Sequence, residues 1–407
     1  MTTEVLDSKY SWFRLAISLA VASFGSVGMW AVVVIMPALQ ADFGIDRAGA
    51  SLPYALTMVG FALGNLLMGR LVDRFGIAWV LMMAAGVLAV GFSLAAAADA
   101  SWLVNLLHVV IGFGTGASFA PLIADISHWF ARRRGIAVAL AASGNYVAGA
   151  FWPLVLSAVL VDYGWRDVYL ALAAVVPLVV IPLALCLRRA IPESALQRAD
   201  AASAARIRDV GLSLRAMRWL LAVAGVGCCI AMSMPQVHMV ALAVDIGCTP
   251  AVGAQILSVM LLGGVISRVA FGAVADKLGG PRTLIIGSAL QCFALALYLP
   301  FDGVTALYAV SLIFGLSQGG IVPSYAVIVR EYFPARQAGA VTGFVIMATI
   351  VGMASGGWIS GLIRDLSGAY ELAFVNGIAW NFVNIAIMLL ILTKTGAGAA
   401  HRRVRAA

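Results

Sequence analysis

The segment GRLVDRFG at residues 69–76 returns in degenerate form as GAVADKLG at residues 272–279. Three positions correspond at a constant shift of 203 residues, so that Gly69, Asp73 and Gly76 match Gly272, Asp276 and Gly279. The same shift relates Gly116 to Gly319 farther along the chain. Because so many turn-forming positions share one shift, the sequence predicts two homologous halves with the same orientation.

The composition indicates that these halves lie in lipid. Charged residues make up 11% of the chain and AVILMFWYC residues 63%, whereas a soluble domain carries roughly 25% charged residues. Each apolar stretch is near the ~20 residues that a helix needs to cross a bilayer. We therefore predict an all-α membrane protein with twelve transmembrane helices, at about 14–37, 49–71, 77–97, 102–127, 136–161, 168–188, 218–243, 251–274, 283–299, 304–329, 338–363 and 371–393.

The distribution of charge predicts the orientation. Only Arg47, Arg166 and Arg364 fall in predicted outer loops, and most other basic residues flank the opposite ends of the spans. Positive residues collect on the cytoplasmic side, so both termini are expected there, in a multi-pass protein of the inner membrane. The +8 net charge is thereby explained without a nucleic-acid partner.

The spans group into two bundles of six around a pseudo-two-fold axis. We expect a cytoplasmic tail at 1–13, an N-terminal bundle at 14–188, a linker at 189–217, a C-terminal bundle at 218–393 and a basic tail at 394–407. The first apolar stretch is too long for a signal peptide and lacks a cleavage site. The arginine-rich linker is interpreted as a solvated tether, with binding of anionic lipid headgroups as the alternative. A monomer in the membrane is expected.

The motif G-x-x-x-D-R/K-x-G between spans two and three resembles the signature loop of the major facilitator superfamily. The resemblance covers the whole chain and implies a secondary transporter whose path runs between the bundles. It implies a cytoplasmic gate formed by Gly69, Asp73, Arg74, Gly76, Gly272, Asp276 and Lys277. Each aspartate is either a latch at a helix N-terminus or part of a tight turn. The first copy departs from the family in continuing Ile77-Ala78-Trp79, without basic residues.

Five further segments resemble the prokaryotic monocarboxylate and oxalate–formate transporter group. They are GFGTGASFAP, HWFARRRGIAVALAASGNYVAG, GWRDVYL, PQVHMVALAVDIG and SRVAFGAVADKLG. In that group an arginine in span eight, four residues before the loop glycine, binds the substrate carboxylate. Arg268, four residues before Gly272, matches that position. The resemblance therefore implies that Arg268 binds substrate.

Physical chemistry makes Arg268 a candidate independently of the resemblance. A guanidinium in the middle of a span costs at least ~2.5–3.5 kcal/mol, so something must offset it. Gly264, Arg268 and Gly272 form one helical stripe of close approach. A planar fork of donors suits a carboxylate guest. The alternative is a structural contact with Asp125 or with backbone carbonyls.

The repeat also predicts the charge of the substrate. Asn65 occupies the position equivalent to Arg268 in the first half and is neutral. A lone cation favours a small monoanion, and span eleven lacks the lysine of the oxalate-type members. Other polar or aromatic residues predicted near the path, each also explicable by ordinary helix packing, are Asn145, Tyr146, Gln318 and Tyr325.

Proton coupling needs a titrating group in the path. Animal monocarboxylate carriers have an aspartate one turn before the arginine, where this chain has Gly264. The candidates here are His238, beside Pro235 in span seven, and Asp125 at the inner end of span four. No nucleotide-binding loop, catalytic constellation, metal site or cofactor site is indicated.

These observations predict a secondary carrier of a lactate- or pyruvate-like monocarboxylate that works by alternating access, with protons as the coupling ion. The alternatives are an anion exchanger of the oxalate–formate type, which would use a counter-anion, and an efflux pump for lipophilic compounds. An efflux pump for cations would need a buried acid in the pocket. A sensor or channel without a transport cycle is a third alternative.

Overall fold

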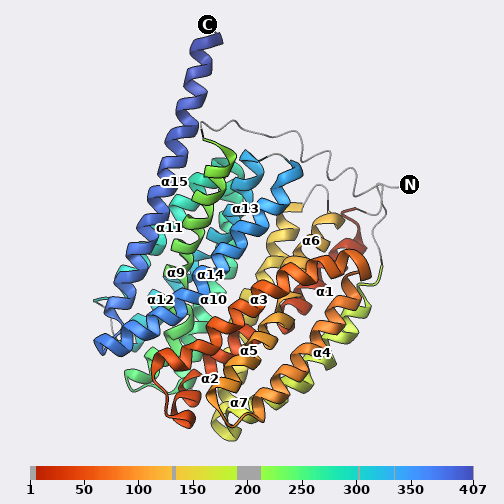
Figure 1. Cartoon of the computed structure of the whole chain (residues 1–407), viewed down its shortest axis with the longest axis vertical. Helices are drawn as coiled ribbons and strands as arrows, with labels where there is room; N and C mark the ends of the chain where they lie inside the picture. The colour runs from red at the N-terminus through yellow and green to blue at the C-terminus, as the bar shows by residue number, and fades with distance from the viewer. Residues whose placement is uncertain (1–5, 131–133, 190–211, 301–302, 334, 407) are drawn as a thin grey trace.

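A computed structural model describes residues 6–130, 134–189, 212–300, 303–333 and 335–406. Within these ranges the regular structure is helical (Figure 1). The helices are α1 (Lys9–Gly25), α2 (Val27–Phe43), α3 (Arg47–Phe75), α4 (Ile77–Ala96), α5 (Ser101–Gly116), α6 (Ala120–Trp129), α7 (Arg134–Leu185), α9 (Leu214–Asp245), α10 (Pro250–Leu278), α11 (Gly280–Leu297), α12 (Val304–Gln318), α13 (Ile321–Tyr332), α14 (Ala335–Ser367) and α15 (Glu371–Ala406).

The described helices agree with the predicted number of membrane crossings. They contain 11 stretches long and apolar enough to cross a membrane, one of which runs for 50 residues from Ile136 to Leu185. A helix of that length would be roughly 75 Å long at 1.5 Å per residue, far more than one crossing needs. It contains Gly164 at φ 84°, a conformation that favours glycine, and the chain turns back there between the fifth and sixth crossings.

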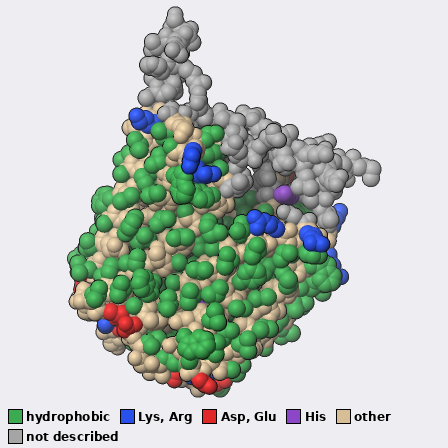
Figure 2. Space-filling model, in the orientation of Figure 1, with side chains coloured by type: hydrophobic (Ala, Val, Ile, Leu, Met, Phe, Trp, Pro, Cys, Tyr) green, Lys and Arg blue, Asp and Glu red, His purple; other side chains and the backbone are tan. Residues whose placement is uncertain are grey.

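The helices form two groups that lie side by side. Figure 1 shows the N-terminal helices, red to yellow, beside the C-terminal helices, green to blue, and α1 begins at the same end of the molecule at which α15 finishes. In Figure 2 a broad apolar surface separates Lys and Arg side chains, which lie mostly at that end, from Asp and Glu at the other. This polarity agrees with cytoplasmic termini, as predicted from the basic residues.

Three of the predicted spans are broken helices. The first breaks at Ser26 between α1 and α2, the fourth between α5 and α6, and the tenth between α12 and α13. The breaks in spans four and ten fall at repeat-equivalent glycines, Gly116 and Gly319. At the first of these, Asn65 Oδ1 accepts a hydrogen bond of 2.9 Å from the backbone N–H of Ala120, which opens α6. Asn65 thus satisfies a donor that the break leaves without a helical partner.

The two halves pack against each other along α3 with α14 and along α7 with α10. Small residues permit the approach. A Cβ built on Gly361 of α14 would lie 2.8 Å from Ser51 Oγ of α3, and one on Gly357 would lie 3.0 Å from the Tyr54 ring. Nearer the cytoplasmic ends, Gly69 and Gly272 make no such contact, since Cβ atoms built on them would meet nothing within 4 Å. The halves are therefore closed together at the outer side.

Candidate functional site

Arg268 lies where the two halves meet near the middle of α10. Its side chain is buried, with 5% of its surface exposed. Nε donates to the Gly319 carbonyl at 3.2 Å, inside the C-terminal half, and Nη1 donates to the Ala142 carbonyl of α7, in the N-terminal half. One guanidinium thus links the break in span ten to the opposite bundle.

An aromatic ring covers one face of this guanidinium. Cζ of Arg268 lies 4.0 Å from the centroid of the Tyr146 ring, one turn after Ala142 on α7. Gly264 makes room for the ring, since a Cβ there would lie 2.9 Å from Cδ2 and Cε2 of Tyr146. A desolvated cation over an aromatic face gains about 2 kcal/mol, which offsets part of the cost of burying it.

Within the described ranges, Arg268 has no carboxylate partner. Asp125, a predicted alternative partner, is bound by Arg14 instead. The third nitrogen of Arg268, Nη2, makes no hydrogen bond to a described residue and is not fully buried. Arg268 therefore makes the backbone-carbonyl contacts that were one of its alternatives, and among the described residues it has no acid partner and one nitrogen without a hydrogen bond.

Gln318 is the second predicted residue near the arginine. It precedes Gly319, whose carbonyl binds Arg268, and is fully buried. Its Oε1 accepts a hydrogen bond of 2.8 Å from Gln236 Nε2, while its own Nε2 has no hydrogen-bond partner in the described part of the chain. A buried amide donor without a partner is costly, so Gln318 is a candidate donor to a guest.

Other predicted binding residues have partners of their own. Trp30 Nε1 donates to the Asn145 carbonyl at 2.9 Å and to its Oδ1 at 3.0 Å, which fixes this amide against α2. The Tyr325 hydroxyl donates to Asn384 Oδ1 at 3.0 Å, inside the C-terminal half. Asn65 caps α6. These hydrogen bonds between helices are the alternative given for these residues in the sequence analysis. None of them brings Tyr325 or Asn65 into contact with Arg268.

The two proton candidates lie in different places. Asp125 forms a bidentate pair with Arg14, with Oδ2 at 2.8 Å from Nε and Oδ1 at 2.8 Å from Nη2. Arg14 is 1% exposed and also donates to the Leu187 carbonyl at 3.0 Å. This ion pair joins α1 to α6 within the N-terminal half, and it gives the Asp125 carboxylate a charged partner.

His238 lies toward the outer side instead, fully buried between α14 and Tyr370. The Gly357 carbonyl can only accept, so at 2.7 Å it requires a proton on His238 Nε2. Nδ1 lies 3.1 Å from the Tyr370 hydroxyl. Burial keeps the pKa of Tyr370 well above its usual range, so its hydroxyl remains a donor and Nδ1 of the neutral ring accepts. A second proton on His238 would reverse this hydrogen bond, because Nδ1 would then donate to the Tyr370 oxygen.

The cytoplasmic motif is described only in part. Gly76 and Gly279 have φ of 81° and 82°, so each ends its helix in a turn that favours glycine, as the sequence predicts. Arg74 and Lys277 are exposed. The side chains of Asp73 and Asp276, on which the predicted latch depends, lie outside the described residues.

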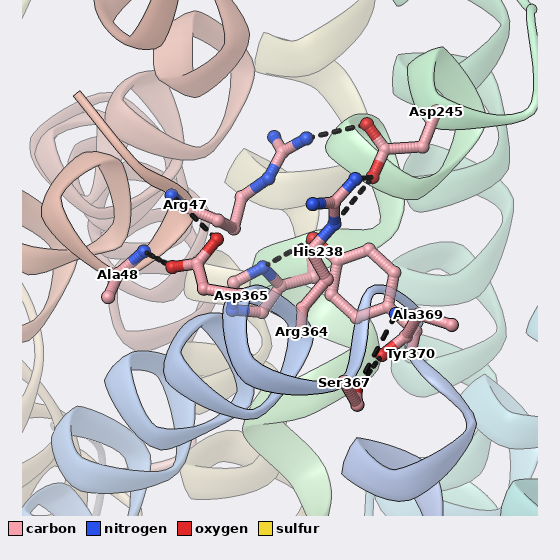
Figure 3. A network of polar contacts seen from close by, with 9 residues as sticks. All are labelled: Arg47, Ala48, His238, Asp245, Arg364, Asp365, Ser367, Ala369 and Tyr370. Carbon is pink, nitrogen blue, oxygen red and sulfur yellow. Dashed lines mark hydrogen bonds and ion pairs between the residues drawn. The ribbon is translucent and has the colours of Figure 1, made fainter. Parts of the chain in front are cut away.

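A network of charges at the outer end was not predicted as a site (Figure 3). Arg47 Nη2 lies 2.6 Å from Asp245 Oδ1, and Arg364 Nη2 lies 3.2 Å from Asp245 Oδ2. Asp365 accepts hydrogen bonds from the first two backbone N–H groups of α3. Opposite charges at the ends of spans two, seven and eleven are the feature of the sequence that could have indicated this network.

These contacts hold the outer ends of the two halves together, because α3 belongs to one half and α9 and α14 to the other. Among the described residues, no three His, Cys, Asp or Glu side chains are grouped to hold a metal ion.

Two packed bundles of membrane-spanning helices are typical of membrane transporters, and sequence comparison gives the family. The profile of the Major Facilitator Superfamily matches residues 18–239 and 220–405. The chain belongs to the major facilitator superfamily, as a multi-pass membrane transporter and not an enzyme.

Several relatives are named for carboxylates. The chain is 29% identical over 331 residues to monocarboxylate transporter 13 of Bos taurus, covering 80% of this chain and 75% of that protein. It is 26% identical to monocarboxylate transporter 11 of Homo sapiens, covering 91% and 80% of the two chains. It is 25% identical to the 4-hydroxybenzoate transporter PcaK of Pseudomonas putida, covering 94% and 90%.

A solved structure has the same fold. A bacterial homologue of the human lysosomal transporter Spinster, in an inward-facing and occupied conformation, superposes with a TM-score of 0.72. The match covers 95% of this chain and 98% of that one at 14% sequence identity. The likeness confirms the predicted architecture.

Proposed function

We propose that this protein carries a small organic monocarboxylate across the inner membrane of a bacterium by alternating access around Arg268. The observation that carries the proposal is the buried guanidinium at the junction of the halves, which has no acid partner among the described residues and one nitrogen free of hydrogen bonds. A bound carboxylate would satisfy that nitrogen and neutralise the charge.

The residues around Arg268 support a small monoanion as the cargo. Tyr146 covers one face of the guanidinium, and two carbonyls occupy two of its nitrogens. The remaining edge suits one carboxylate. Asn65, the neutral repeat equivalent, caps a helix and supplies no second cation for a dicarboxylate. Lactate or pyruvate fits this description. The names of the relatives support a monocarboxylate, and one of them is named for an aromatic monocarboxylate, 4-hydroxybenzoate.

Alternating access is supported by the asymmetry of the contacts between the halves. Outer ends are joined by ion pairs, and the Arg268 contact to the Ala142 carbonyl crosses between the halves near the middle. A carboxylate that bound Nη2 and Nη1 together would compete with that carbonyl for Nη1. Binding of cargo would then loosen a contact between the halves, which is the coupling that a rocking carrier needs.

For the coupling ion we assign protons, carried through His238 and not through Asp125. Both ring nitrogens of His238 bond to groups of span eleven and its outer end, so its protonation state affects the outer contact. Asp125 is neutralised by Arg14. Exchange against a second anion, as in the oxalate–formate type, would use Arg268 in the same way and would not respond to a proton gradient. An efflux pump for lipophilic cations would need an acid beside Arg268.

The test is uptake of radiolabelled lactate by proteoliposomes. Arg268→Gln keeps a polar side chain but removes the charge and should lower uptake by about tenfold or more, since a hydrogen bond to a charged group contributes about 1.5–3 kcal/mol. Arg268→Lys keeps the positive charge but lacks the planar set of donors, so its uptake should lie between that of Arg268→Gln and that of the unaltered carrier. Arg166→Gln is the matched control, because that arginine forms an exposed ion pair with Asp42. Undiminished uptake by Arg268→Gln would overturn the proposal.

A further inference from the structure

The closed outer side already contains a carboxylate bound at a helix N-terminus. Asp365 of α14 accepts from the Arg47 N–H at 3.1 Å through Oδ1 and from the Ala48 N–H at 2.7 Å through Oδ2. These are the first two N–H groups of the 29-residue helix α3, in the other half of the molecule. Free N–H groups and the helix dipole make such an end suitable for an anion.

The side chain at the same helix end has unused donors. Arg47 is 4% exposed, and its Nη2 binds Asp245, but Nε and Nη1 are buried without a hydrogen-bond partner among the described residues. Three of the five guanidinium N–H groups belong to those two nitrogens. Leaving charged donors unsatisfied in the interior is costly, so the closed state lacks an acceptor that Arg47 could use.

The acid that binds Arg47 has a second partner. Asp245 Oδ2 lies 3.2 Å from Nη2 of Arg364, and both residues belong to the C-terminal half. If the outer ends separate, Asp245 keeps Arg364 while Arg47 leaves with the N-terminal half. Separation therefore does not leave the aspartate unpaired.

Two acids that precede Arg47 in the sequence bind other donors. Asp46 caps α3 by accepting from the Gly49 N–H at 2.7 Å, and Asp42 is paired with Arg166 at 2.7 Å. Asp365, in turn, withdraws with the C-terminal half. An outward-open molecule would thus present the Arg47 guanidinium and two backbone N–H groups together at its mouth, without an acid that binds them.

We infer that Arg47 and the N-terminus of α3 form an outer loading site for the carboxylate of the cargo. The inference rests on the proposed function and adds a second station before Arg268. In the closed state Asp365 occupies the helix end, and in the open state the incoming monoanion takes its place. Cargo and Asp365 compete for the same donors, so a carboxylate from outside favours the open state, and closure follows once the cargo has moved inward to Arg268.

The test measures the external KM for radiolabelled lactate in right-side-out membrane vesicles. Arg47→Gln should raise this KM by about tenfold or more, because it removes a charged donor that the cargo meets only from outside. The half-saturating lactate concentration in inside-out vesicles should stay near that of the unaltered carrier. Arg47→Lys keeps the charge, so its external KM should lie between the values of Arg47→Gln and the unaltered carrier. This variant also tests the loading site if Arg47→Gln fails to reach the membrane.

The matched control removes the same ion pair from its other end. Asp245→Asn breaks the pair but keeps every donor of Arg47, so the external KM should not rise, and Asp365→Asn, which weakens the competing carboxylate, should lower it. Equal rises for Arg47→Gln and Asp245→Asn would show that Arg47 only closes the outer side, and this would overturn the loading site, as would an unchanged KM in Arg47→Gln. Failure of the proposed function would appear differently, as undiminished transport by Arg268→Gln on both sides of the membrane.

Discussion

The guanidinium of Arg268 lies 4.0 Å above the ring of Tyr146, and the two residues belong to opposite halves of the carrier. The ring shields one face of the cation, while the carbonyls of Ala142 and Gly319 take Nη1 and Nε. Rocking of the halves would separate the cation from the ring and from Ala142 together. In the proposed cycle the pair would therefore link binding of the cargo at Arg268 to the conformation of the two halves.

The ring of Tyr146 and its hydroxyl should contribute unequally to binding. The hydroxyl contacts the sulfur of Met232 at 3.9 Å, a weak interaction, so Tyr146→Phe should leave the KM for lactate nearly unchanged. Tyr146→Leu removes the aromatic face, worth about 0.5–2 kcal/mol, and should raise the KM roughly two- to thirtyfold. Equal KM values for the two variants would argue against a role of the ring in orienting Arg268.

Gly264 is predicted to be required because of the same ring. A Cβ at this position would lie 2.9 Å from two ring carbons, so Gly264→Ala should push Tyr146 away from Arg268 and weaken lactate binding. Gly86→Ala is the control, since a Cβ there meets nothing within 4 Å and the change also removes a helix glycine. The measurement is the Kd for lactate of the two purified variants. If both bind lactate like the unaltered carrier, the close packing of Gly264 against Tyr146 has no functional consequence.

The pair between Arg14 and Asp125 should act on stability more than on transport. Arg14 is 1% exposed and Asp125 15%, so Asp125→Asn leaves a buried guanidinium without its charge partner, a change that costs about 3–5 kcal/mol in buried pairs. Asp42→Asn breaks a pair in which both side chains are 40% exposed and should cost at most about 1 kcal/mol. Thermal unfolding in detergent should rank the two variants in that order, and the reverse order would contradict a structural task for Asp125.

His238 is predicted to transmit the proton gradient. In the unaltered carrier an inward proton gradient should stimulate lactate uptake, and His238→Asn should lose the stimulation while retaining lactate-for-lactate exchange. The reason is that Nδ1 accepts from Tyr370 and Nε2 donates to the Gly357 carbonyl, so a second proton alters contacts at the outer closure. Loss of the gradient response in Asp125→Asn, with retention in His238→Asn, would reverse the assignment.

The fold could be predicted from the sequence because its determinants are local. An apolar stretch of ~20 residues spans a bilayer whatever its neighbours are, and the two copies of the glycine–aspartate motif relate the halves. The breaks within spans one, four and ten were not predicted. They depend on tertiary contacts, such as the hydrogen bond from Ala120 N–H to Asn65 Oδ1 across two helices.

The candidate site was predictable only in part. Arg268 stood out because an arginine in the middle of a span needs compensation, but its contact with the Ala142 carbonyl depends on how the halves approach each other. The partner of the Tyr325 hydroxyl, Asn384, could not be predicted, because sequence position does not specify which side chains of two helices meet. Arg47 appeared to be an ordinary loop charge, and its burial results from closure of the outer ends.

The most direct measurement of the central claim is the equilibrium binding of radiolabelled lactate to the purified carrier and to Arg268→Gln, at one pH and without a gradient. Loss of the charged donor should weaken the Kd by about tenfold or more, while Arg166→Gln binds like the unaltered protein. Equal Kd values for Arg268→Gln and the unaltered carrier would mean that the buried guanidinium does not hold the cargo.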